Sequence, residues 1–121
     1  MALTETNRAG EFIISEGNGT YSREAITVVS GQNLAAGTVV GKITASGKYT
    51  AYDDDLSAGT GDAAAGILYA AVDASGGDAP GVIICRQAEV ADSLLVWAST
   101  NDSGDKTAGK ADLAALGIII R

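Results

Sequence analysis

The stretch "LAAGTVVGKITASGKYTAY", residues 34–52, carries the clearest indication of the fold. Its first half is rich in β-branched residues, Ser46-Gly47 is a turn signal, and a second short run, "KYTAY", follows the turn. These features predict a hairpin over residues 38–52. Gly41 lies inside the first predicted strand, where a glycine indicates a bulge or a close approach of another backbone segment.

The same stretch has some features of a phosphate-binding loop, because it contains Gly37, Gly41 and Lys42. A P-loop needs a glycine five positions before its second glycine, a Ser or Thr directly after the lysine, and a helix that begins there. Here Ala36 occupies the first position and Ile43 follows the lysine, in a segment that predicts a strand. The sequence therefore predicts no nucleotide site at this point.

The rest of the chain predicts a mostly β domain with one short C-terminal helix. Sixteen glycines and a single proline indicate short strands joined by tight turns. The helix is expected at residues 106–117, with Gly117 at its C-terminal cap. A loop is expected at residues 53–64, and residues 91–97 fit either a strand or a short helical turn. Further strands are expected at residues 25–29, 65–74, 82–90 and 118–121.

Residues 1–24 differ in composition from the remainder, which divides the chain into an N-terminal arm, 1–24, and a β domain, 25–121. The arm begins with a polar segment, continues with the apolar patch "EFIIS", residues 11–15, and ends in a turn-rich link. In an extended arm the consecutive apolar side chains would point to both faces. The patch therefore fits a partner-binding segment as well as a frayed terminus.

Composition excludes several functional classes. The net charge is −7, with 15 acidic and 8 basic residues, so the clustered Lys and Arg that contact nucleic-acid phosphates are missing. No signal peptide is recognisable at the N-terminus, and the longest apolar runs are far shorter than the roughly 20 residues that span a membrane. We expect neither direct nucleic-acid binding nor membrane insertion.

The sequence predicts no catalytic residue, cofactor site or metal site. Without histidine, neither a Cys–His pair nor a Ser-His-Asp triad can form. The single cysteine, Cys85, is interpreted as a small core residue. The acidic run Asp53–Asp55 lacks the alternating ligands and terminal Glu of an EF-hand, which favours a solvated turn. Weak cation binding by this run together with Asp62 is kept as a secondary hypothesis.

Trp97, the only tryptophan, follows an apolar run. An indole buries a large area, so a core anchor is the favoured interpretation in a domain with few aromatic residues. A position in an interface is the alternative, since Trp is enriched in binding hot spots.

The chain as a whole resembles the head decoration proteins of lambda-type tailed bacteriophages. Five segments in conserved order carry the resemblance: "EFIISEGNGTYSRE" (11–24), "LAAGTVVGKITASGKYTAYDDD" (34–55), "GDAAAGILYAAVDAS" (61–75), "SLLVWA" (93–98) and "LAALGIII" (113–120). The resemblance implies a β-clip-like small barrel or ribbon with an extended N-terminal arm. It also implies a structural virion protein, made in the host cytoplasm, and not an enzyme.

The resemblance further implies a homotrimer on the outer surface of the expanded head, at its three-fold positions, where it stabilises the capsid against the pressure of packed DNA. Its partner would be the major capsid protein, bound by the arm through strand addition. The expected capsid-binding residues are Glu11, Phe12, Ile13, Ile14 and Ser15, and the expected structural residues are Gly41, Trp97 and Gly117.

Two other classes were weighed against this one. "LAAGTVVGKI", residues 34–43, also resembles small β-clip domains of sugar-acid enzymes, which would make the chain a ligand-binding module. That resemblance covers only about ten residues. A hydrolase of the virion or host envelope is the least favoured class, because no histidine and no clustered acid pair support it.

Overall fold

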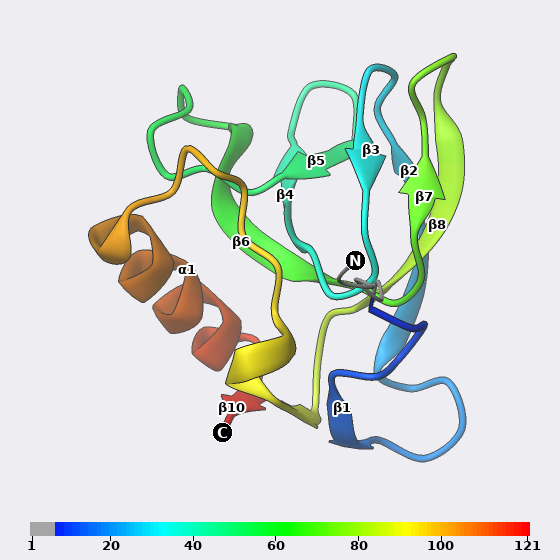
Figure 1. Cartoon of the computed structure of the whole chain (residues 1–121), viewed down its shortest axis with the longest axis vertical. Coiled ribbons are helices and arrows are strands. Elements are labelled where there is room, and N and C mark those ends of the chain that lie inside the picture. The colour runs from blue at the N-terminus through cyan, green and yellow to red at the C-terminus, as the bar shows by residue number, and fades with distance from the viewer. Residues whose placement is uncertain (1–6) are drawn as a thin grey trace, which may run out of the picture.

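The predicted hairpin is present in the computed structural model of the chain, which describes residues 7–121. Its strands are β4 (Val39–Ile43) and β5 (Tyr49–Ala51), which pair antiparallel with Val40 opposite Ala51. β4 also pairs on its other side with β6 (Thr60–Leu68), so the hairpin lies within a larger sheet. Figure 1 shows these strands side by side at the centre of the molecule.

The larger sheet closes into a five-stranded barrel in the order β2-β5-β4-β6-β8. β2 (Arg23–Val28) and β8 (Ala79–Ile84) run antiparallel along their whole length, and β8 pairs with the end of β6. Closure removes the exposed edges that an open sheet would present. The prediction of a mostly β domain with one short C-terminal helix is confirmed, with 39% strand and 14% helix.

A second, three-stranded sheet lies at one end of the barrel, next to the C-terminus (Figure 1). Its central strand is β9 (Ala88–Val90), which is antiparallel to β1 (Ile13–Glu16) and parallel to β10 (Ile118–Ile120). The remaining elements are short: β3 (Asn33–Leu34), β7 (Val72–Asp73) and the 3-10 turn η1 (Asp92–Leu94).

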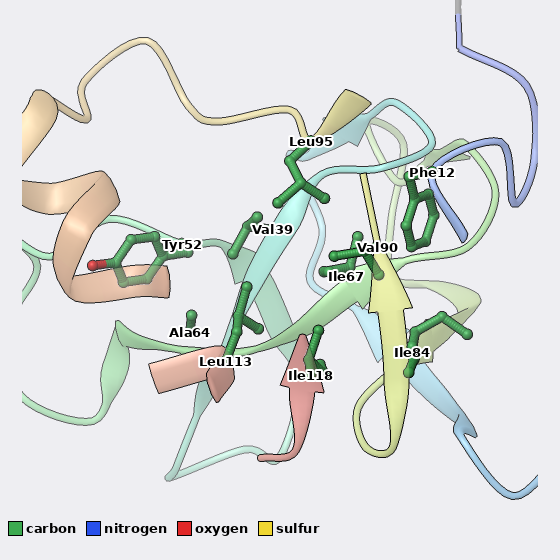
Figure 2. Close-up of a cluster of buried hydrophobic side chains, with 11 residues drawn as sticks. Phe12, Val39, Tyr52, Ala64, Ile67, Ile84, Val90, Leu95, Leu113 and Ile118 are labelled. Atoms are coloured by element: carbon green, nitrogen blue, oxygen red, sulfur yellow. The ribbon is translucent and has the colours of Figure 1, made fainter. Parts of the chain in front are cut away.

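Two cores lie on the two sides of the barrel wall. Consecutive residues of a strand point to opposite faces, and in three strands both residues of an apolar pair are buried. Val40, Leu68 and Ile83 belong to the core inside the barrel. Their neighbours Val39, Ile67 and Ile84 belong to the outer core, which α1, β9 and β10 cover (Figure 2). The buried Cys85 packs in the inner core, as the sequence predicted.

The helix α1 (Ser103–Ala115) begins three residues earlier than predicted. Asp102 caps it, because its carboxylate accepts from the backbone N–H of Asp105 while the Asp105 carboxylate accepts from the N–H of Asp102. Gly117 follows the helix with φ of +88°, a conformation that favours glycine at a helix end. Gly109, within the helix, packs where a Cβ would lie 2.8 Å from the rings of Trp97 and Tyr52.

The predicted strands at residues 65–74 and 82–90 are each divided in the structure, and the first falls partly in β6 and partly in β7. β6 begins at Thr60, inside the predicted loop, because the small residues of "GDAAAG" pair with β4. The predicted strand at residues 82–90 is divided into β8 and β9. Gln87 separates the two strands with φ of +46°, which an extended strand cannot accommodate.

Gly41 provides a direct test of the barrel wall. A Cβ on Gly41 would lie 2.6 Å from the carbonyl oxygen of Gly61 and 2.8 Å from that of Ala63. Both atoms are backbone, and the β4–β6 register is irregular on both sides of Gly41. We expect Gly41→Val to lower the free energy of unfolding by about 3 kcal/mol, measured by urea denaturation. Gly76→Val is the matched control, because a Cβ on Gly76 has no neighbour within 4 Å.

Candidate functional site

The N-terminal segment lies against the domain from residue 7 onward. Phe12 is 1% exposed and belongs to the outer core, where Figure 2 shows it next to Val90. Its carbonyl oxygen accepts from the N–H of Ala91 at 2.8 Å. Within the described residues, Phe12 packs on the outer core and β1 pairs with β9, so this part of the expected arm 1–24 contacts the β domain. Residues 1–6 of the expected arm lie outside the described residues.

The five residues expected to bind the capsid occupy different environments. Phe12 is buried and Ile13 is half-buried, whereas Glu11, Ile14 and Ser15 are exposed. The register of β1 on β9 shifts between Ile13 and Ser15, so that Ile14 lies in a bulge and is 53% exposed. Within the described residues, the side of β1 away from β9 pairs with no other strand. β1 thus combines an open edge with an exposed apolar side chain.

A polar network joins the three strands on the solvent face of this sheet. Ser15 and Ile119 are both register partners of Glu89, so the three side chains share one face. The hydroxyl of Ser15 donates to Glu89 Oε2 at 2.6 Å, and Arg121 Nε donates to Glu89 Oε1 at 2.7 Å. These hydrogen bonds and the Arg121 charge hold the pKa of Glu89 below its usual range. Ile119 is 52% exposed beside them.

Sequence reasoning missed Glu89, Ile119 and Arg121 as parts of this surface. The exposure of Ile119 could have been predicted, because in a strand over "IIIR" the middle isoleucine points to the opposite face from Ile118 and Ile120. The order of the strands in this sheet could not be predicted from the sequence, because β10 follows the helix and then pairs in parallel with the distant β9. An open groove runs beside β10, and its lining includes Ala114 and Lys110 of α1.

The three expected structural residues serve separate parts of the fold. Gly41 lies in the barrel wall. Gly117 follows the C-terminal end of α1, and a Cβ at this position would lie 3.0 Å from the side chain of Gln87. Trp97 is half-buried on the outer core, and its ring meets Tyr52 edge-on with centroids 6.0 Å apart. This packing favours the core interpretation of Trp97 over the interface.

One group of carboxylates comes together within residues 7–121. An oxygen from each of Asp53, Asp55 and Asp105 lies within 4.8 Å of the other two. The secondary hypothesis from the sequence combined the Asp53–Asp55 run with Asp62, but the Asp62 carboxylate, at the start of β6, accepts from the N–H of Gly59. In residues 7–121 no helix is long and apolar enough to cross a membrane.

A closed barrel with an exposed three-stranded sheet at one end defines a small structural or binding domain. A family model described as bacteriophage lambda head decoration protein D matches residues 2–118. Because the match covers nearly the whole chain, the chain belongs to this family of phage capsid decoration proteins. The family is structural and is not an enzyme family. No curated protein sequence matches the chain.

The two burial states within "EFIIS" lead to opposite expectations for stability. Phe12→Ala should lower the free energy of unfolding by about 3–5 kcal/mol, because it leaves a cavity in the outer core. Ile14→Ala removes an exposed side chain and should change it by less than about 0.5 kcal/mol. Urea denaturation of both variants checks this. Equal losses would contradict the assignment of Phe12 to the core and Ile14 to the surface.

Glu89 should make the sheet sensitive to acid. In the folded protein the pKa of Glu89 lies below its usual range, so the stabilisation that the ionised carboxylate contributes is present at higher pH and is lost as pH falls through the folded pKa. We expect Glu89→Gln to flatten the decline of unfolding free energy below pH 4.5 relative to the parent. Asp54→Asn, which removes one carboxylate outside this sheet, serves as the control and should retain more of the decline.

Proposed function

We propose that the chain is a structural virion protein that decorates the outside of the expanded phage head as a homotrimer at the three-fold positions. There it stabilises the capsid against the pressure of packed DNA. The observation that carries the proposal is that β1 has both an unpaired strand edge and an exposed apolar side chain, Ile14, within the described residues. Family membership supports the capsid role.

The contact with the major capsid protein is assigned to the outer edge of β1. An open strand edge adds to a strand of a partner through main-chain hydrogen bonds, and neighbouring side chains supply specificity. Ile14 is the apolar side chain of this edge, while Glu11 and Ser15 flank it as exposed polar groups. Phe12 and Ile13 anchor the strand instead, because they pack on the outer core.

In a homotrimer, each β1 contact with the capsid protein can be weak and binding to the head can still be stable. A short edge with one large apolar side chain offers little area, so each contact alone should be weak. Three copies joined in one particle raise the effective concentration of the second and third contacts. Binding then depends on three partner edges at the right separation, which fits a preference for the expanded head.

Decoration of expanded, undecorated heads tests the β1 assignment. Ile14→Asp should weaken saturable binding by at least about tenfold, since a charge would be buried against the partner strand. Leu56→Asp is the matched control, because Leu56 is also exposed, at 39%, in the loop between β5 and β6. Binding is measured by co-sedimentation and located by imaging of the decorated heads.

Undiminished decoration by Ile14→Asp would show that β1 is not the contact. Deletion of residues 2–15 is a less informative test, because it also removes Phe12 from the core. Sedimentation equilibrium of the free protein tests the oligomer separately, with three times the chain mass of 12.1 kDa as the expected result. A monomer at all concentrations and on the head would contradict the trimer.

A further inference from the structure

The carboxylate group at the first turn of α1 joins two segments that are distant in the sequence. Asp53 and Asp55 follow β5, whereas Asp105 lies in the first turn of the helix. Two of the three side chains are held in place. Asp53 accepts from the N–H of Asp55 at 3.0 Å and from the hydroxyl of Thr100 at 2.6 Å. Asp105 is buried and accepts from the N–H of Asp102.

Among residues 7–121, no basic side chain forms an ion pair with any of the three carboxylates. The ion pairs between residues in 7–121 involve other acids, namely Glu16, Glu24, Asp78, Glu89 and Asp92. The charge of Asp105, burial and the nearby aspartates raise the pKa of Asp55. Mutual repulsion of this kind opposes the packing of the loop against α1 unless a cation lies among the oxygens.

The side-chain oxygen of Asn101, in the segment between Thr100 and Asp102, is buried and has no hydrogen-bond partner among residues 7–121. Asn101 is 8% exposed, and its Nδ2 donates to the carbonyl oxygen of Tyr52 at 2.8 Å. Its Oδ1 is buried and accepts no hydrogen bond from residues 7–121. Asn101 precedes the N-cap residue Asp102 and is bonded to the residue before Asp53, so it lies between the two halves of the group. A buried acceptor without a donor needs an explanation, and a bound cation supplies one.

We propose that Asp53, Asp55 and Asp105 form a binding site for a divalent cation such as Ca²⁺, with Asn101 Oδ1 as a further oxygen ligand. An all-oxygen set selects hard cations over zinc or copper. Ca²⁺ lies about 2.3–2.6 Å from each ligand, so two opposed ligands are about 4.6–5.2 Å apart. The limit of 4.8 Å between the carboxylate oxygens fits this spacing.

Such a cation would fasten the loop between β5 and β6 to the first turn of α1. The site does not depend on the proposed capsid contact, which lies on β1. It differs from an EF-hand because its ligands come from two segments, which is why the spacing of "DDD" alone did not predict it.

Terbium luminescence tests the site in the full-length protein. Tb³⁺ replaces Ca²⁺ and is excited through nearby aromatic rings. The Tyr52 hydroxyl donates to the Asp105 carbonyl oxygen at 2.8 Å, and Trp97 stacks edge-on against Tyr52. We expect sensitised emission that millimolar Ca²⁺ displaces. Asp55→Asn should weaken Tb³⁺ binding at least about tenfold, because it removes one of three charged ligands.

Asp54→Asn is the matched control, since it removes the same charge from the same loop but no ligand. It should weaken Tb³⁺ binding by less than about threefold. At one fixed Ca²⁺ concentration, the melting temperature of the parent should also rise more than that of Asp55→Asn. If both variants lost the same Tb³⁺ affinity, binding would reflect only the negative charge of the loop, and the proposal would be overturned. Absence of Ca²⁺-displaceable emission from the parent would overturn it as well.

Discussion

The burial of both faces of the barrel wall is the constraint on which the rest of the structure depends. Val39-Val40, Ile67-Leu68 and Ile83-Ile84 each place one side chain inside the barrel and the next outside it. The inner side chains pack with one another and with Leu34 of β3 and Val72 of β7. The outer side chains need a cover, because apolar area left in water weakens folding. The helix and the three-stranded sheet supply that cover, and so the barrel determines where β1, α1 and β10 pack.

This constraint also separates folding from binding within the N-terminal segment. Phe12 reaches the outer core, which fixes the path of the chain directly before β1. The bulge that follows turns Ile14 outward, because the register shifts at that point. The anchor Phe12 and the proposed contact Ile14 are therefore close neighbours in the sequence. A firm anchor presents the edge of β1 in one orientation, which reduces the entropy lost when a partner strand pairs with it.

The parts of the fold governed by local chemistry could be predicted from the sequence. The turn at Ser46-Gly47 identified the hairpin, and Ala and Leu at helical spacing before Gly117 identified the helix. The early start of β6 was missed because Ala and Gly have low strand propensity and are recruited by pairing with β4. The burial of Phe12 and the meeting of Asp53 with Asp105 were missed for a related reason. Both depend on contacts between distant segments, which no local pattern contains.

The close approach of β4 and β6 at Gly41 limits how this family member can vary. The atoms nearest to a Cβ at Gly41 are carbonyl oxygens and a Cα of the facing strand, which every residue type carries. A compensating substitution across the strands therefore cannot make room, since no side chain is responsible for the clash. Gly61 itself has φ of +109°, which restricts that position independently. Neighbouring positions can vary together. At position 41, however, any side chain meets the same backbone atoms of β6 and destabilises the barrel.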